Sequence, residues 1–303
     1  MNRQQIDALV KQMNVDTAKG EVDARVQQIV VRLLGDLFQA IEDLDIQPSE
    51  VWKGLEYFTD AGQANELGLL AAGLGLEHYL DLRADEADAK AGITGGTPRT
   101  IEGPLYVAGA PESVGFARMD DGTETGKIDT LSTVTDTDGN IIENAKVEVW
   151  HANSLGNYSF FDKSQSDFNL RRTIFTDADG KYVALTTMPV GYGCPPEGTT
   201  QALLNKLGRH GNRPSHVHYF VSAPGYRKLT TQFNIEGDEY LWDDFAFATR
   251  DGLVATAVDV TDPAEIQRRG LDHAFKHITF NIELVKEAAA APSTEVERRR
   301  ASA

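Results

Sequence analysis

Cysteine and positive charge are scarce in this 303-residue sequence. Cys194 is the only cysteine, so no disulfide forms within the chain, which is typical of a protein from a reducing compartment. Lys and Arg number 29 against 46 Asp and Glu, which gives a net charge of −17. Nucleic-acid binding depends on positive charge that displaces counterions, so this balance argues against a nucleic-acid partner. The acidic surface instead favours solubility.

Long apolar runs are also missing from the sequence. No stretch approaches the roughly 20 apolar residues that span a bilayer, and the opening residues, MNRQQIDALVKQMN, lack the apolar segment of a secretory signal peptide. We therefore expect a cytoplasmic protein with no membrane span. The length corresponds to about two domains, and a hydrophobic content of 41% is enough to build a core.

The first ninety residues have the periodicity of helices. From Val22 to Leu44 apolar residues recur at intervals of three or four, often as adjacent pairs, which no strand can produce. We expect this helix to stop at Pro48, a second helix to be capped by Ser49, and a third to run over 65–80. The apolar face of the first helix is wide. It is covered either by a partner subunit or by the rest of the same chain.

Residues 83–96 form a charged and then Gly/Thr-rich connector, after which short β-branched and aromatic runs alternate with turn signals. We expect an α+β, mainly β, protein with an antiparallel β-sandwich domain at 96–285. A helical dimerisation and linker region at 1–95 precedes it, and a disordered tail at 286–303 follows. The expected strands are 127–134, 146–150, 173–176, 182–187, 216–222, 229–235, 254–260 and 278–284.

A pair of histidines is the sharpest local feature of the β region. His216 and His218 lie in the run Arg213-Pro214-Ser215-His216-Val217-His218. If His216 begins a strand, both imidazoles point to one face, where they could ligate a metal. The alternative is two histidines on a solvated sheet face.

Two tyrosines occur in loops rich in glycine and proline. Each of Tyr158 and Tyr192 could simply pack its ring beneath its loop. Together with the histidine pair they have a chemical logic, because two phenolates at neutral pH need a hard, strongly Lewis-acidic cation, for which Fe(III) is the natural candidate. Two phenolates and a hydroxide also balance its charge. Zinc would favour His and Cys ligands, and Cys194 alone cannot complete such a shell.

These segments resemble the iron-binding segments of the intradiol ring-cleaving dioxygenases. The resemblance lies in Gly156-Asn157-Tyr158, Pro189-Val190-Gly191-Tyr192 and Arg213 to His218, and it extends over nearly the whole chain. The helical N-terminal region and the length are similar to those of the bacterial members that cleave catechol. The resemblance implies a β-sandwich enzyme of aromatic-compound degradation that uses O2 to convert catechol to cis,cis-muconate.

The same resemblance implies roles for individual residues. Tyr158, Tyr192, His216 and His218 would hold one mononuclear non-haem Fe(III) per subunit. Tyr192 would leave the metal and take a proton from catechol, Arg213 would stabilise the charged ring, and Gln232 would support it. The substrate pocket would be lined by Leu69, Ala72, Ile101, Pro104, Leu105, Arg213, Phe245 and Ala246. Each apolar member of this set could equally be ordinary core.

The resemblance also implies a homodimer through the N-terminal helices, with a phospholipid at the interface. Two alternatives stay open for the function. The same chemistry could act on hydroxyquinol, protocatechuate or a chlorocatechol. Protocatechuate carries a carboxylate that would need a basic group in the pocket, so the largely apolar walls favour unsubstituted catechol or alkyl- and halocatechols. A non-catalytic β-sandwich binding module is the other alternative. That reading gives no reason for two loop tyrosines beside a histidine pair.

Overall fold

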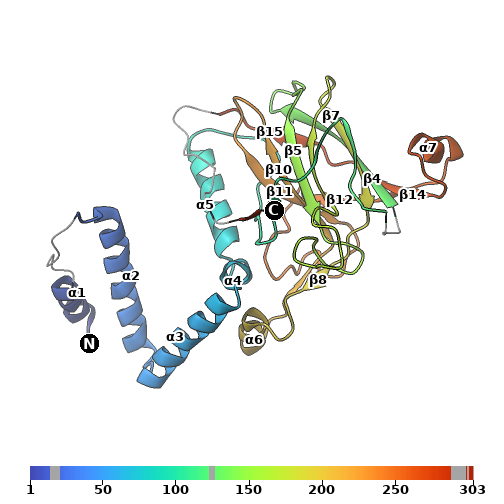
Figure 1. Ribbon diagram of the computed structural model, residues 1–303. Helices are drawn as coiled ribbons and strands as arrows, with labels where there is room; N and C mark the ends of the chain where they lie inside the picture. Colours follow the sequence, from blue (N-terminus) through green and yellow to red (C-terminus); the bar gives the residue numbers. More distant parts are fainter. Residues whose placement is uncertain (14–20, 123–126, 288–297, 299, 303) are drawn as a thin grey trace. The chain divides into compact units, whose positions relative to one another are not determined.

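The computed structural model describes residues 1–13, 21–122, 127–287, 298 and 300–302, and it divides into two compact units, Met1–Ala64 and Asn65–Ala303 (Figure 1). The first unit consists of helices. In it α1 packs against α2, and the side chains of Ile6 and Val10 are buried. The helices of this unit are α1 (Arg3–Met13), α2 (Ala24–Asp43) and α3 (Pro48–Gln63).

The start of α3 differs from the expectation. Pro48 is the first residue of this helix and does not merely stop the preceding one, and Gln47, not Ser49, is its N-cap. Proline is well suited to the first helical position because its missing N–H would have no intrahelical partner there. The Glu50 side chain accepts a hydrogen bond of 2.8 Å from the Gln47 N–H and closes the first turn.

The single helix expected over 65–80 is two helices, α4 (Leu67–Gly73) and α5 (Leu76–Lys90). Gly75 separates them with a φ of 77°, a left-handed conformation that ends α4. The second helix continues to Lys90, through residues expected to form the connector. These residues are mostly Ala, Asp, Glu, Arg and Lys, most of which favour helix, and the glycine-rich stretch begins only after them.

The second unit contains two six-stranded sheets (Figure 1). The strand order is β12-β11-β10-β5-β6-β2 in the first and β13-β14-β4-β7-β3 in the second, where β15 also pairs with β4. Two short ribbons pair β8 with β9 and β1 with β16. The bounds are β1 (Val107–Ala108), β2 (Glu112–Val114), β3 (Phe116–Arg118), β4 (Lys127–Asp136), β5 (Lys146–His151), β6 (Arg171–Phe175), β7 (Lys181–Thr187), β8 (Tyr192–Gly193), β9 (Asn212–Arg213), β10 (His216–Ser222), β11 (Leu229–Ile235), β12 (Val254–Ala255), β13 (Val258–Val260), β14 (Phe275–Ile278), β15 (Ile282–Leu284) and β16 (Ala301–Ser302), with the helices α6 (Thr199–Lys206) and α7 (Pro263–Arg268) between them.

The mainly β sandwich class is confirmed, and the structure adds parallel pairs to it. The long central strands pair antiparallel, as in β10 with β5 and β11, whereas short strands such as β12 and β2 join their neighbours parallel. The strand expected over 254–260 is divided, because β12 pairs in one sheet and β13 in the other. The strand expected over 278–284 is likewise two strands, β14 and β15.

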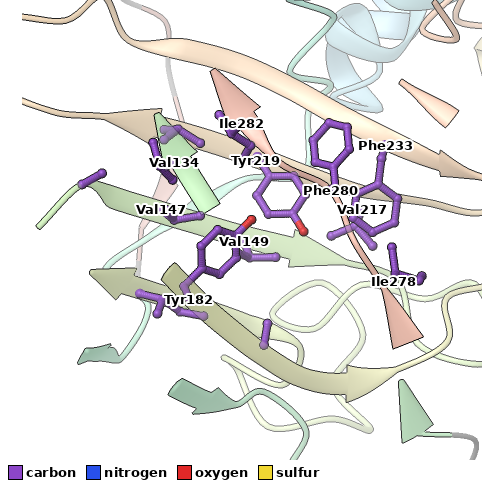
Figure 2. Packing of buried hydrophobic residues seen from close by; sticks show 14 of the residues in the cluster. Val134, Val147, Val149, Tyr182, Val217, Tyr219, Phe233, Ile278, Phe280 and Ile282 are labelled. Carbon is purple, nitrogen blue, oxygen red and sulfur yellow. The ribbon is translucent and has the colours of Figure 1, made fainter. Parts of the chain in front are cut away.

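The core lies between the two sheets (Figure 2). Val217, Tyr219 and Val221 of β10 point into it, because alternate residues of a strand face opposite sides. His216 and His218 therefore lie on the other, outer face of the first sheet. The core includes, beside the β10 residues, Val134, Val147, Val149, Tyr182, Phe233, Ile278, Phe280 and Ile282.

The expected tail, 286–303, lies mostly outside the described residues. Of its described members, Arg300 makes two hydrogen bonds of 2.9 Å to the Glu102 carboxylate, and β16 pairs parallel with β1. None of the helices in the described part of the chain has both the length and the apolar character that crossing a membrane requires.

Asp81 on α5 makes stability depend on pH. Its Oδ2 is buried with no hydrogen-bond partner among the described residues, and burial raises the pKa of this carboxyl to about 7. The folded state therefore holds the proton more tightly than the unfolded chain. This stabilisation is fully present below pH ~4 and is lost as the pH rises through 7.

We predict that Asp81→Asn raises the melting temperature by a few degrees at pH 8 and changes it little at pH 4. Differential scanning calorimetry at both pH values measures this. Glu86→Gln, which removes an exposed carboxylate from the same helix, is the control and should not show this rise. An Asp81→Asn effect of the same size at both pH values would contradict the account.

Candidate metal centre

The two histidines of β10 bring their ring nitrogens together. The Nε2 atoms of His216 and His218 lie 3.1 Å apart, and both side chains are buried. In the ladder His218 lies between Trp150 of β5 and Gln232 of β11, and His216 is opposite Asn234. Directly opposed residues share a face of a sheet. These side chains consequently form one polar and aromatic row on the outer face.

The two tyrosines approach the histidines from separate loops. The Tyr158 Oη lies 3.4 Å from the His216 Nε2, and the Tyr192 Oη lies 3.5 Å from both of these atoms. Gly156 permits this approach, since its φ is 82° and a Cβ there would lie 3.0 Å from the Tyr192 Cβ. The structure thus brings all four predicted ligands to one point.

Burial sets the protonation of these donors. It lowers the pKa of His216 well below its ordinary value, with a further contribution from the Arg213 charge, and it does the same to His218, with a contribution from His216. The His216 Nδ1 lies 2.6 Å from the Pro214 carbonyl oxygen, to which it donates, so its Nε2 is the unprotonated nitrogen whose lone pair could ligate a metal. Both imidazoles are neutral, which is the form that ligates metals.

Burial has the opposite consequence for the phenol of Tyr158. It raises the pKa well above the ordinary value, and the neighbouring Tyr192 raises it further. This oxygen becomes a phenolate only if a strong positive charge lies beside it. A weakly polarising cation would therefore not deprotonate the Tyr158 phenol.

The spacing and chemistry of the four donors suit a metal ion. Nitrogen and oxygen ligands about 2 Å from a shared ion lie about 3 Å from one another, which is close to the separations of 3.1–3.5 Å found here. In the described residues no three His, Cys, Asp or Glu side chains gather to hold a metal. A metal at this point would depend on the phenol oxygens, and two phenols with two imidazoles fit Fe(III).

Arg213 lies beside the donors, on the β8–β9 ribbon opposite Tyr192. Its Nη1 is 3.0 Å from the His216 Nε2, its Nη2 donates to the Gln232 Oε1 at 2.9 Å, and the guanidinium pairs with Asp244. Although burial opposes its charge, the carboxylate of Asp244 raises the pKa of Arg213 above its ordinary value. A permanent positive charge therefore adjoins the four donors.

Most predicted wall residues lie in one apolar cluster. Pro104 is exposed beside Gly68, and Leu105 packs in a second cluster with Tyr158 and Tyr192. A cavity of about 690 Å³ runs beside α5, and of the predicted walls only Ile101 lines it. The apolar cluster that holds most of the walls contains five predicted residues, Leu69, Ala72, Ile101, Phe245 and Ala246. Three further members were not predicted: Cys194, Leu204 and Ala248.

The structure also shows residues that the sequence analysis missed. The Trp150 ring stacks on the His218 ring, with 5.0 Å between the ring centres and an angle of 6° between the ring planes. The Arg171 guanidinium lies 5.8 Å from the centre of the Tyr158 ring and donates to Ser159 and to the Leu105 carbonyl. Trp150 could have been found from the strand register, had the pairing of β5 with β10 been known. No sequence signal marks Arg171.

Two family models match the chain. The model described as "Dioxygenase" matches residues 101–285, and the one described as "Catechol dioxygenase N terminus" matches residues 23–92. The chain belongs to the intradiol ring-cleavage dioxygenase family.

Particular relatives are very similar to this chain. The catechol 1,2-dioxygenase of Acinetobacter guillouiae is 81% identical over 295 residues, which cover 96% of this chain and 97% of that protein. The crystal structure of wild-type Acinetobacter radioresistens catechol 1,2-dioxygenase is 89% identical, with a TM-score of 0.98 over 100% of this chain and 99% of that one. The hydroxyquinol 1,2-dioxygenase of a Rhizobium strain is only 32% identical, over 82% of this chain and 84% of that protein.

Proposed function

We propose that this protein cleaves catechol between its two hydroxyl-bearing carbons and inserts both atoms of O2 to give cis,cis-muconate. The observation that carries the proposal is the gathering of two buried imidazoles and two phenols in a chain 81% identical to a catechol 1,2-dioxygenase. The degradation of aromatic compounds is the setting in which such an enzyme acts. The single cysteine favours the cytoplasm as its compartment.

In this proposal Tyr158, Tyr192, His216 and His218 hold one mononuclear non-haem Fe(III) per chain. The bound iron would draw electron density from the catecholate and so make a ring carbon reactive toward O2. The neutral imidazoles contribute no charge, so that the two phenolates supply most of the balance for the cation.

The two tyrosines have different roles in the proposal. Tyr158 is 4% exposed and fixed within an aromatic cluster, whereas Tyr192 lies on a two-residue strand and is partly exposed. Tyr192 can therefore move more readily. We assign it as the base whose Oη accepts one of the two protons that catechol loses when it binds as a dianion.

Arg213 and Gln232 act on the charge of the ring. Arg213 as a whole residue is 3% exposed, and its guanidinium lies 3.0 Å from a proposed ligand atom, so water screens its charge little. It stabilises the negative charge that the ring carries as it reacts. Gln232 accepts a hydrogen bond from Arg213 and limits the directions in which the guanidinium can point.

The apolar walls favour catechol over more polar rings. Leu69, Ala72, Ile101, Phe245 and Ala246 present no basic group to a substrate carboxylate. Steady-state rates with catechol, 4-methylcatechol, 4-chlorocatechol, hydroxyquinol and protocatechuate, followed by product absorbance, test this assignment. Catechol should give the highest kcat/KM. A higher value for hydroxyquinol, or no turnover of any ring by the iron-loaded protein, would overturn it.

We predict that Tyr192→Phe keeps its iron but turns over catechol at least tenfold more slowly, whereas His216→Ala loses the metal. The reason is that Tyr192 is proposed to leave the iron during the cycle, while His216 stays bound. Iron per chain and kcat are the measurements. Equal loss of iron from both variants would contradict the separate role of Tyr192.

We further propose that the helical part, 1–95, assembles the protein as a homodimer and that 96–285 is the catalytic domain. Support comes from the apolar side chains along α2 that remain exposed among the described residues of their own unit. A second copy of the same face would bury them. A phospholipid between the two faces is part of the same proposal. The residues concerned are Val26, Ile29, Val30, Leu33 and Leu37.

We predict that Leu33→Glu produces a monomer at micromolar concentration, because Leu33 is 62% exposed in one chain and a charge there would be buried in the dimer. Analytical ultracentrifugation measures the mass. The control, Gln28→Glu, places the same charge on an exposed polar position of the same helix and should stay dimeric. A wild-type protein that sediments as a monomer would contradict the interface.

A further inference from the structure

We propose that Asp244 is a positioning residue for this reaction: it holds Arg213 against the proposed iron ligands and fixes the turn that carries Phe245 and Ala246. The inference rests on the proposed function. It concerns a residue that lies 31 positions from Arg213 in the sequence and contacts it directly.

Asp244 and Arg213 form a buried ion pair. The Asp244 Oδ2 lies 3.1 Å from the Arg213 Nη2, and the Oδ1 lies 3.2 Å from the Nε. The exposed fractions of the two side chains are 1% and 4%. Two contacts to one edge of a planar guanidinium fix its orientation as well as its position. Since the pair is shielded from water, no solvent molecule can take the place of the carboxylate.

The remaining edge of the guanidinium is directed toward the reacting centre. With Nε and Nη2 held by Asp244, and Nη2 also donating to Gln232, Nη1 faces the His216 Nε2 at 3.0 Å. Gln232 is itself fixed, because its amide donates to the Asn234 Oδ1 at 2.7 Å. Asp244 and Gln232 thus direct the charge that the proposed chemistry needs through their hydrogen bonds to Arg213.

Asp244 also organises the chain that follows it. Its Oδ1 accepts a hydrogen bond of 3.0 Å from the Ala246 N–H, and its Oδ2 accepts one of 3.3 Å from the Ala248 N–H. Phe247, between them, has a φ of 57°, which the turn imposes on a residue other than glycine. The Phe245 N–H donates to the Asn212 carbonyl, next to Arg213. The Asp244 carboxylate therefore fixes the position of the Arg213 guanidinium and the turn that carries the apolar wall residues.

A carboxylate is required because four donors converge on it. An asparagine of the same shape would have one acceptor oxygen, and its amide N–H groups would face the guanidinium or the backbone N–H groups. It would also leave the buried charge of Arg213 without a counter-charge. We therefore expect Asp244→Asn to release the guanidinium from its fixed direction.

A second buried pair offers a matched control. Asp129 of β4 accepts hydrogen bonds from the Arg269 Nε at 2.5 Å and from the His277 Nδ1 at 2.6 Å, and its side chain is 1% exposed. It belongs to the second sheet, and its hydrogen-bond and ion-pair partners among the described residues, Arg269 and His277, are not proposed site residues. Asp129→Asn removes an equally buried carboxylate. It should lower the melting temperature and leave kcat within twofold of wild type.

The experiment compares kcat, KM and iron per chain in four proteins: wild type, Asp244→Asn, Arg213→Met and the double variant. Asp244→Asn should keep its iron and lower kcat at least tenfold. In the Arg213→Met background the same change should alter kcat less than twofold, because its effect on kcat is exerted through Arg213, whereas the shift of the turn at Phe245 should raise KM in both backgrounds. An unchanged kcat in Asp244→Asn, or an equal loss with and without Arg213, would overturn the proposal.

A crystal structure of the Asp244→Asn variant gives a second readout that does not depend on activity. The Arg213 guanidinium should leave Gln232, and the turn at Phe245 should shift. An unmoved guanidinium would overturn the positioning role even if activity fell. Failure of the proposed function is distinguishable, because the wild-type protein itself would then not turn over catechol, while the position of Arg213 in the variant would still decide this inference.

Discussion

The alternation of side chains along β10 is the constraint on which both core and site depend. Val217, Tyr219 and Val221 enter the core between the sheets, so His216 and His218 must face the other way. A shift of register by one residue would bury the imidazoles in the sandwich and expose the valines. The packing that stabilises the fold therefore also fixes the direction of two proposed ligands. The loops that cover the outer face then exclude water from them.

Burial, once imposed by those loops, determines the electrostatics. It keeps both imidazoles neutral and the Tyr158 phenol protonated, while Asp244 keeps Arg213 charged. A trivalent cation among these donors is the one addition that would turn the phenols into phenolates. Although the net charge of the chain is −17, Arg213 places a positive charge beside the donors, where an anionic substrate would bind.

Features encoded by neighbouring residues could be predicted from the sequence. The bounds of β10 and β11 are those expected, because both have continuous β-branched and aromatic patterns. The role of Pro48 at the start of α3 was not predicted, since a proline can either end one helix or begin another. The pairing of Arg213 with Asp244, and the stacking of Trp150 on His218, could not be predicted. Both contacts depend on which strands and turns become neighbours in the fold, and a single sequence does not reveal this. The histidine pair and the two loop tyrosines could be singled out from their spacing and surroundings, and the resemblance to a family then implied that they form one ligand set.

The central claim is that two imidazoles and two phenols hold a single Fe(III). Titration of the iron-free protein with Fe(III), followed by resonance Raman spectroscopy in the visible band, tests it most directly. We expect saturation at one iron per chain together with tyrosinate vibrations enhanced by phenolate-to-iron charge transfer. Saturable iron binding without tyrosinate vibrations, or no binding at all, would contradict it.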